Sequence, residues 1–182
     1  MTSIAIVGDG PGGLSAALFL AKAGHDVRVY GTDDTAMNFA YLYNYLGIEA
    51  ISGTDFQLAA RAQVAAQGAE LIAETVTAVS ASGDGFEVTT ENGSWTADHL
   101  VLSEGKAAPL AGSLGLVADG DAIAVDRDGR TSLAGVYVIG RSARPSRSQA
   151  IISAGDGAAA ALDILAVVAG KDVQDWDSPP KD

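Results

Sequence analysis

The fold is decided by residues 4–30, which read IAIVGDGPGGLSAALFLAKAGHDVRVY. Residues 4–7 form a short apolar run, an Ala- and Leu-rich stretch covers residues 14–23 up to Gly24, and residues 27–30 contain two valines and a tyrosine. This order predicts a buried strand, a helix that ends at a glycine, and a second strand. Two parallel strands joined by a helix form a right-handed βαβ unit, so we expect an α/β fold.

The turn between the first strand and the helix carries glycines at the spacing Gly-x-Gly-x-x-Gly. Gly8 allows the sharp exit from the strand, Gly10 lets the backbone approach a pyrophosphate, and Gly13 lets the helix pack closely against the sheet. Free amides and the positive end of the helix dipole then receive the phosphate charge. With a strand before it and a helix after it, this motif favours dinucleotide binding over a glycine turn that has no ligand.

The residue that would contact the ribose of the dinucleotide departs from the usual pattern. The fingerprint expects an acid at the end of the second strand. That position is Gly31, and Thr32, Asp33 and Asp34 follow it. We therefore expect the ribose contact to come from Thr32 or from the main chain, and the identity of the dinucleotide stays open on this motif.

The rest of the chain predicts further elements of the same fold. Residues 54–57 have the spacing of a capping box, and the helix that they begin is expected to run to Gly68. Alternating pieces between residues 75 and 98 predict an antiparallel meander beside the main sheet. Residues 36–47 carry no charge and have aromatic side chains at alternate positions, and we expect them to be tightly packed. Further core strands are expected at 69–72, 99–102, 123–125 and 135–139, and a last helix at 149–169.

The overall composition excludes several classes of protein. The 182 residues include 11 basic and 23 acidic side chains, which gives a net charge of −12, and no cysteine. Such a surface repels nucleic acid and anionic lipid, so neither is an expected partner. Without cysteine any redox function needs a bound cofactor. The N-terminus has no secretory signal and the apolar run at 158–169 is shorter than a membrane span, so we expect a soluble, cytoplasmic protein.

Other charged and polar groups are weaker candidates for binding or catalytic residues. Arg141, Arg144 and Arg147 precede the last helix, and on an acidic chain they favour a local anion site. The alternative is a solvated loop whose arginines pair with neighbouring acids. His25 and His99 are expected to be structural, no metal site is expected, and no catalytic residue can be assigned.

Five segments, in the right order, resemble one known family. They are residues 8–17 (GDGPGGLSAA), 44–47 (NYLG), 103–105 (SEG), 131–140 (TSLAGVYVIG) and 149–155 (QAIISAG). Together they resemble the thioredoxin reductase-like FAD-dependent pyridine nucleotide-disulfide oxidoreductases. The chain departs from that family at Leu46, where a proline is usual, and at Arg141, where an aspartate is usual. It has no second glycine motif and no Cys-x-x-Cys pair, so the resemblance implies a truncated member without the NAD(P)H domain.

The resemblance implies non-covalent FAD as the cofactor. It places Gln149 and Ala150, at the start of the last helix, near the pyrimidine edge of the flavin, where a helix N-terminus stabilises negative charge. Arg141 would contact phosphate or an aromatic face instead of ribityl hydroxyls. The candidate cofactor-binding residues are Gly8, Gly10, Pro11, Gly12, Gly13, Gly31, Thr32, Asn44, Val76, Ser103, Gly105, Gly140, Arg141, Gln149, Ala150 and Ile151.

We therefore expect residues 1–182 to form a single Rossmann-like FAD-binding domain, with a central parallel sheet, flanking helices, a small antiparallel meander and a loose tail at 172–182. Its expected function is transfer of hydride or electrons through FAD without reduction of a disulfide by a dithiol of its own. NAD(P)H or an electron-transfer partner protein would supply the electrons, and the resemblance implies a homodimer. The alternatives are a non-enzymatic FAD carrier or sensor, and an NAD(P)-binding protein.

Overall fold

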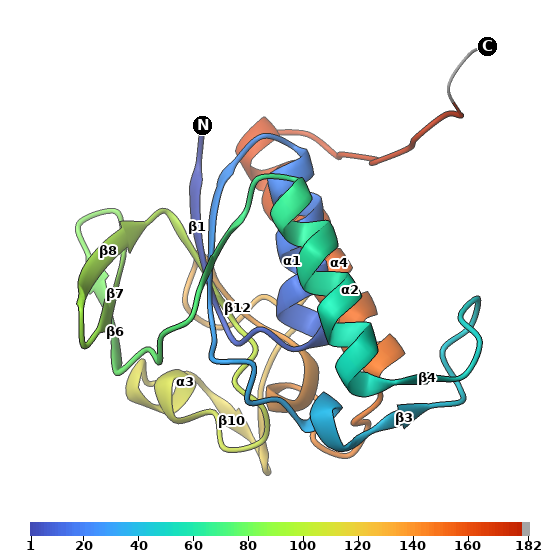
Figure 1. The fold of residues 1–182 in the computed structure, drawn as a ribbon. Coiled ribbons are helices and arrows are strands. Elements are labelled where there is room, and N and C mark those ends of the chain that lie inside the picture. The colour runs from blue at the N-terminus through green and yellow to red at the C-terminus, as the bar shows by residue number, and fades with distance from the viewer. Residues whose placement is uncertain (180–182) are drawn as a thin grey trace.

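The structure, a computed structural model, describes residues 1–179 and has a parallel sheet of five strands at its centre (Figure 1). Every neighbouring pair of strands in this sheet is parallel. The predicted α/β class and the predicted βαβ unit are confirmed. The strands, in spatial order, are β12 (Val136–Val138), β9 (His99–Leu102), β1 (Ser3–Val7), β2 (Asp26–Tyr30) and β5 (Glu70–Ile72).

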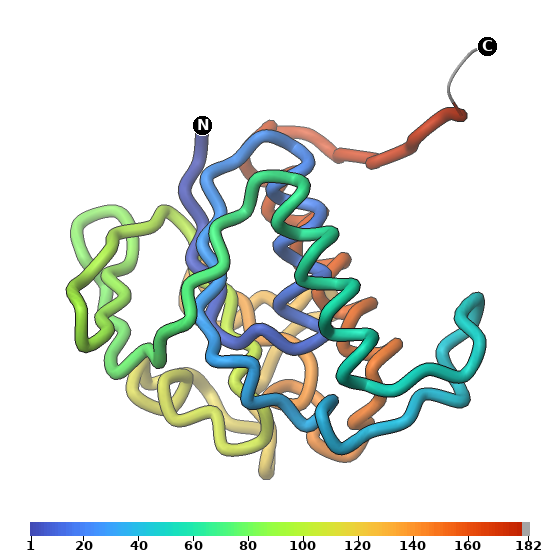
Figure 2. Tube along the Cα trace, viewed as in Figure 1, coloured from blue at the N-terminus to red at the C-terminus, as the bar shows by residue number. Residues whose placement is uncertain are grey.

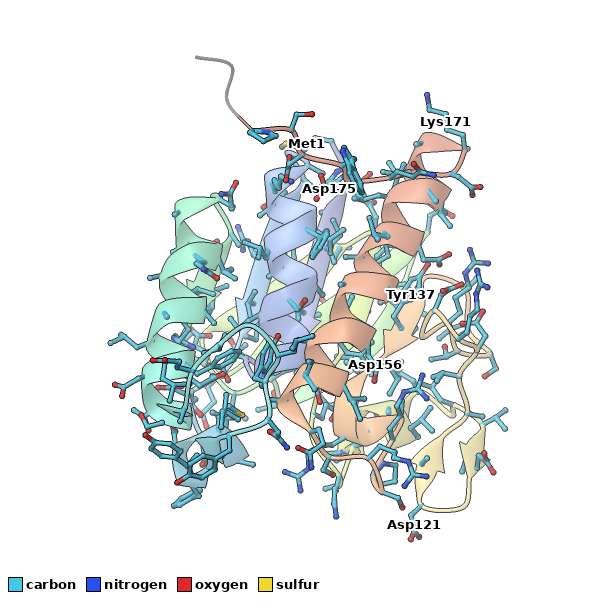
Figure 3. The ribbon with its side chains drawn as sticks, turned by 90° about the vertical axis from the view of Figure 1, so that its right-hand side faces the viewer. Met1, Asp121, Tyr137, Asp156, Lys171 and Asp175 are labelled. Carbon is cyan, nitrogen blue, oxygen red and sulfur yellow. The ribbon has the colours of Figure 1, made fainter. Side chains whose placement is uncertain are left out.

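Alternate residues of the central strands enter two separate cores. Ile4 and Ile6 of β1 belong to the core under the helices, whereas Ala5 and Val7 belong to the core on the opposite face. Side chains of a strand point alternately to the two faces of a sheet, so a strand buried on both faces is apolar throughout. The helices that cover the first face lie side by side (Figure 3), and they are α1 (Pro11–Lys22), α2 (Gly53–Ala66) and α4 (Ala150–Ala169).

The opposite face is covered by the predicted antiparallel meander, so the molecule has three layers. Phe86 and Val88 of the middle strand point into this second core. The prediction of a core strand at 123–125 is wrong: of these residues only Ile123 is in a strand, and it belongs to a short hairpin outside the main sheet. The elements of this side are β6 (Ala78–Ser82), β7 (Gly85–Thr90), β8 (Gly93–Ala97), α3 (Pro109–Ser113), β10 (Ala118–Asp119) and β11 (Ala122–Ile123).

Helix α4 packs along α1 and is fixed to the sheet by a polar cluster. The Asp163 carboxylate accepts hydrogen bonds from the Tyr137 hydroxyl of β12 at 2.7 Å and from the Arg130 guanidinium at 2.6 and 2.7 Å. Figure 3 shows Tyr137 beside α4. The helix has 20 residues, longer than the apolar run considered above, and by length and composition alone it could cross a membrane. Its Ile164 is fully buried in the core, as in the central helix of a globular fold.

In the segment from 36 to 52, here called the aromatic arm, residues 41–52 project from the molecule (Figure 1), while residues 36–39 pack against α2. Tight packing was expected, and this expectation is wrong for most of its large side chains: Phe39 is 91% exposed, Tyr43 81% and Leu46 88%. The absence of charge over 36–47 was misleading, because an uncharged run can also lie on the surface. The arm consists of the 3₁₀ helix η1 (Ala36–Phe39), β3 (Tyr41–Leu42) and β4 (Ile51–Ser52).

The N-cap of α2 lies two residues before the predicted one. Ser52 is the N-cap, and its hydroxyl accepts a hydrogen bond from the Asp55 amide at 3.1 Å and donates one to the Asp55 carboxylate at 2.7 Å. Gln57, expected to reach back to the cap, is instead buried, and its side-chain amide donates to the Asp9 carbonyl. Ser, Thr and Asp are all favoured N-cap residues, so the local sequence alone does not decide which of Ser52, Thr54 and Asp55 caps the helix.

The chain leaves α4 in an extended path (Figure 2). A loose tail is expected at 172–182; residues 172–179 have no regular secondary structure, and residues 180–182 lie outside the described residues. The tail is nevertheless attached, because the Lys22 ammonium donates to the Asp175 carboxylate at 2.9 Å. Asp177 accepts a second bond from the same ammonium.

Candidate functional site

The candidate site lies at the carboxyl ends of the central strands, around the glycine turn (residues 8–13). The Gly8 amide donates to the Tyr30 carbonyl of β2 at 2.8 Å, which holds the turn against the sheet. A Cβ atom on Gly13 would stand only 1.9 Å from the Gly8 carbonyl oxygen. The close approach of helix to strand predicted from the motif is therefore present. The N-terminus of α1, with Pro11 at its first turn, faces the cleft beyond this turn.

Two cavities of about 540 Å³ each open at this edge of the sheet. They have Gly8, Asp9, Asp34 and Glu104 in common, so they adjoin one another across the glycine turn. The first cavity, here the arm-side cavity, is enclosed by the aromatic arm and the start of α4. The second, here the meander-side cavity, lies between the end of β2 and the first strand of the meander. The result is one elongated cleft with phosphate-binding geometry at its middle.

The structure brings most of the predicted cofactor-binding residues to this cleft. Gly8, Gly10, Pro11, Gly12, Asn44, Ser103, Gly105, Arg141, Gln149 and Ala150 line the arm-side cavity. Gly31, Thr32 and Val76 line the meander-side cavity, together with Gly8. The other three, Gly13, Gly140 and Ile151, line neither cavity. Gly13 has a packing role, and Ile151 points outward and is 37% exposed.

The predicted arginine cluster divides into residues with different surroundings. Arg141 is half-buried, lines the arm-side cavity, and its buried Nε has no hydrogen-bond partner within the described chain. Arg144 instead pairs with Asp156 at 3.0 Å, as the alternative interpretation expected, and Arg147 is exposed outside both cavities. A buried, unpaired guanidinium nitrogen is costly, so Arg141 is the group in this cleft that most needs an anionic or polar ligand.

The aromatic arm is joined to the start of α4 by one side-chain hydrogen bond. Asn44 Nδ2 donates to Gln149 Oε1 at 3.1 Å, across 105 positions of sequence. Gln149 is the residue before α4 but its side chain makes no capping bond, so the first amides of α4 are open toward the arm-side cavity. Two helix N-termini, those of α1 and α4, therefore face one cavity, and both favour negative charge there.

Sequence reasoning did not identify four charged residues of the cleft, one of which, Glu74, lines the meander-side cavity. Glu104 borders both cavities, and its carboxylate accepts from the amides of Leu110 and Ala111 at 2.8 and 3.0 Å. Burial raises the pKa of Glu104, and the two amide bonds oppose that shift. Lys106 lines the arm-side cavity, and Asp9 is buried within the glycine turn. Asp9 stands between two motif glycines, which is the one signal that could have marked it.

The fold and the cleft together define a dinucleotide-binding α/β protein of the Rossmann type. A dinucleotide has two halves joined by a pyrophosphate, and the cleft has two cavities joined at a glycine turn with a helix N-terminus. FAD fits this arrangement, because an unpartnered guanidinium nitrogen, a carboxamide pair and helix amides converge in one cavity. The other cavity has apolar side chains such as Val76 and Leu110 beside several polar ones.

Comparisons with known proteins agree with this class. The family model described as pyridine nucleotide-disulphide oxidoreductase matches residues 2–54. Thioredoxin reductase of Spironucleus barkhanus is 34% identical over 110 residues, which are 58% of this chain and 36% of that protein. Thioredoxin reductase of Streptomyces clavuligerus is 36% identical over 96 residues, which are 50% of this chain and 30% of that protein. The chain thus spans about a third of the length of these curated relatives.

Solved structures show the same fold. A thioredoxin reductase from Gloeobacter violaceus has a TM-score of 0.90 at 17% identity, covering 97% of this chain and 99% of that chain. The atypical thioredoxin reductase TRi from Desulfovibrio vulgaris Hildenborough has a TM-score of 0.85 at 18% identity, covering 93% of this chain and 99% of that chain. The resemblance seen in the motifs is confirmed: over part of its length the chain is similar to thioredoxin reductases and to the pyridine nucleotide-disulphide oxidoreductase family, whose members are FAD-dependent.

Proposed function

We propose that this chain binds one FAD non-covalently along the cleft and exchanges hydride or electrons through its isoalloxazine ring. The observation that carries the proposal is the pair of equal cavities that meet at the glycine turn. A flavin nucleotide has this two-part form, and a bound flavin supplies redox chemistry that no side chain of this cysteine-free sequence offers.

The arm-side cavity is the better match for the flavin half. Arg141 and the amides at the start of α1 would hold the pyrophosphate, since both favour an anion. Asn44 and Gln149, already bonded to each other, would orient the pyrimidine edge, and the open amides of α4 would stabilise negative charge at that edge. Val76 would lie against the adenosine half in the other cavity.

The electrons must reach the flavin and leave it by way of other molecules. The 182 residues contain no cysteine, so a dithiol of this sequence cannot pass electrons to a disulfide. We propose a diffusible NAD(P)H or a partner protein as the electron donor, and reduction by either should be slow compared with a donor held in place.

A homodimer is a further part of the proposal. The aromatic arm exposes Phe39, Tyr43 and Leu46, and residues 36–47 carry no charge on a chain of net charge −12. Two copies that approach through the arm avoid most of the repulsion between their acidic surfaces. Sedimentation equilibrium over a range of protein and salt concentrations tests this, and a monomer at every concentration would contradict it.

The decisive experiment is an absorption spectrum of the purified protein, followed by anaerobic addition of NADH or NADPH. We expect a yellow, oxidised flavin spectrum that one of the nicotinamides bleaches slowly. A bound flavin that neither nicotinamide reduces, but that photoreduction does, would favour the carrier or sensor alternative. Mass analysis of the released ligand separates FAD from NAD(P), and a protein that binds neither after incubation with both would contradict the proposal.

A further inference from the structure

Gly31 stands where an acid usually binds the ribose of a dinucleotide, and the structure shows what fills that place. A Cβ atom on Gly31 would lie 2.3 Å from Cγ and 2.5 Å from Oδ1 of Asp9. No side chain at position 31 can coexist with this arrangement. The Asp9 carboxyl group, which belongs to the glycine turn, thus occupies the space in which the Cβ atom of an acid at position 31 would lie.

The surrounding chain is built to hold this carboxylate. The Asp33 amide donates to Asp9 Oδ2 at 2.9 Å, and Asp33 adopts a left-handed φ of 59°. Arg61 of α2 pairs with the same oxygen, and Gln57 donates to the Asp9 carbonyl at 2.9 Å. A left-handed conformation is uncommon for a residue other than glycine, so the turn after β2 is folded around Asp9.

The second carboxylate oxygen of Asp9 is the one left for a ligand. Within the described chain, both hydrogen bonds to the carboxylate go to Oδ2 and none goes to Oδ1. Asp9 also borders both cavities, beside the end of β2. Arg61 balances the charge, which lets an acid stand next to a pyrophosphate site with less repulsion than a bare carboxylate would cause.

We infer that Asp9 replaces the missing acid of β2 and accepts hydrogen bonds from the adenosine ribose hydroxyls of the bound cofactor through Oδ1. The inference rests on the proposed function, because it assumes a dinucleotide in the cleft. It assigns the ribose contact to a residue of the glycine turn, in place of the contact from Thr32 or the main chain that the sequence favoured. It also means that positions 9 and 31 compete for the same space, so that a side chain at position 31 requires a smaller residue at position 9.

The test compares the affinities of FAD and FMN, since FMN lacks the adenosine half. Apoprotein is titrated with each flavin by fluorescence, for the wild type and for Asp9→Ser. Loss of a charge-assisted hydrogen bond should weaken FAD about tenfold or more and leave FMN within about twofold. ADP should displace FAD from the wild-type protein more effectively than 2′,3′-dideoxy-ADP, which lacks the ribose hydroxyls. In Asp9→Ser the two nucleotides should displace FAD equally well.

Two further variants separate a ribose contact from a merely structural role. Asp34→Ser removes an acid from the same cleft, and since less negative charge favours a pyrophosphate, FAD affinity should stay equal or rise. The exchange Asp9→Gly with Gly31→Glu also removes the Asp9 Cβ, which would lie 2.7 Å from a Cβ at position 31, and it should recover FAD affinity to within about threefold. Gly31→Glu alone should destabilise the fold because of the contact with Asp9. Should Asp9→Ser fail to fold, Asp9→Asn keeps the shape, and its FAD-to-FMN affinity ratio should fall about threefold or more.

The outcomes distinguish the inference from the proposed function. A wild-type protein that binds neither flavin overturns the proposed function itself. A wild type that binds FAD while the Asp9 variants keep its FAD-to-FMN ratio and its preference for ADP overturns only the role of Asp9. A wild type that binds FMN as tightly as FAD overturns it too, since the adenosine half would then contribute nothing.

Discussion

The glycine turn and the aromatic arm border the same cavity, yet they are fixed to very different degrees. The turn is held by the Tyr30 carbonyl, by Gln57 and Arg61 of α2, and by contact of α1 with the sheet. The arm is anchored by the buried Met37 and Leu42, while its tip lies in solvent.

This difference shows that the two sides of the cleft have different tasks. The turn presents backbone amides, whose positions must not vary if they are to meet a pyrophosphate. The tip of the arm instead contributes side chains that are mostly exposed, such as Tyr43 and Leu46. Substitutions in the turn should therefore affect folding and binding together, and substitutions at the tip of the arm should affect neither. Four experiments test this contrast.

The largest effect is expected where α4 touches the glycine turn. A Cβ atom on Gly157 would stand 2.1 Å from the Gly12 carbonyl oxygen, whereas one on Gly155 of the same helix would meet nothing within 4 Å. Gly157→Ala should lower the free energy of unfolding by about 2–3 kcal/mol, and Gly155→Ala should raise it by up to about 1 kcal/mol. Urea denaturation of both variants checks this pair. Equal stabilities would show that the turn is not rigidly supported.

A smaller effect is expected for the unpaired arginine of the cleft. Arg141→Gln should weaken FAD binding about tenfold, or about 1.4 kcal/mol, because a charge-assisted contact to phosphate is lost. The variant should also bind FAD with less dependence on salt than the wild type. Arg147→Gln is the control, since Arg147 lies in the same loop outside both cavities, and it should change affinity less than threefold. Equal losses in both variants would indicate a general charge effect instead.

Glu104, opposite the turn, should give a pH-dependent effect of less than about 1 kcal/mol because it is partly exposed. Burial raises the pKa of Glu104, so the folded state holds the proton more tightly than the unfolded state does. This contribution to stability is present below the ordinary pKa of glutamate and is lost as pH rises through the raised pKa. Glu104→Gln should therefore gain stability relative to the wild type between pH 5 and pH 8. A constant difference between the two proteins would contradict the raised pKa.

The smallest effect on stability is expected at the tip of the arm. Tyr43→Ser combined with Leu46→Ser should change the free energy of unfolding by less than about 0.5 kcal/mol, because both side chains are exposed. The same double variant should be monomeric under conditions in which the wild type associates. A large loss of stability would mean that the arm is needed for the fold and would remove the contrast with the turn.

The sequence predicted those features that depend on local periodicity. The βαβ unit follows from an apolar strand, a glycine motif and an Ala-rich helix, and the meander follows from alternating residues between turns. The family motifs also brought Asn44, Arg141 and Gln149, which lie far apart in sequence, to one cavity. The predictions of the βαβ unit and the meander succeeded because each rests on a backbone requirement that few residue types satisfy, whereas the roles of the three cavity residues stay predictions.

The sequence did not reveal contacts that depend on a distant partner. Ser52, and not Thr54, caps α2, and Gln57 turns inward because the Asp9 carbonyl offers it an acceptor. The arm lacks charge, which is compatible with burial and with exposure alike. Asp9 was hidden for the same reason: its role depends on the space above Gly31 and on Arg61 of α2, and neither is visible in a six-residue motif.

The attachment of the tail to Lys22 has a practical consequence for experiments on this protein. Lys22 ends the helix that starts beside the cleft, so about 18 Å of helix separates the tail from the glycine turn. The N-terminus precedes β1 at that same remote edge (Figure 1). Tags, surface tethers or fused reporters can therefore be joined at either end while leaving the coenzyme entrance clear.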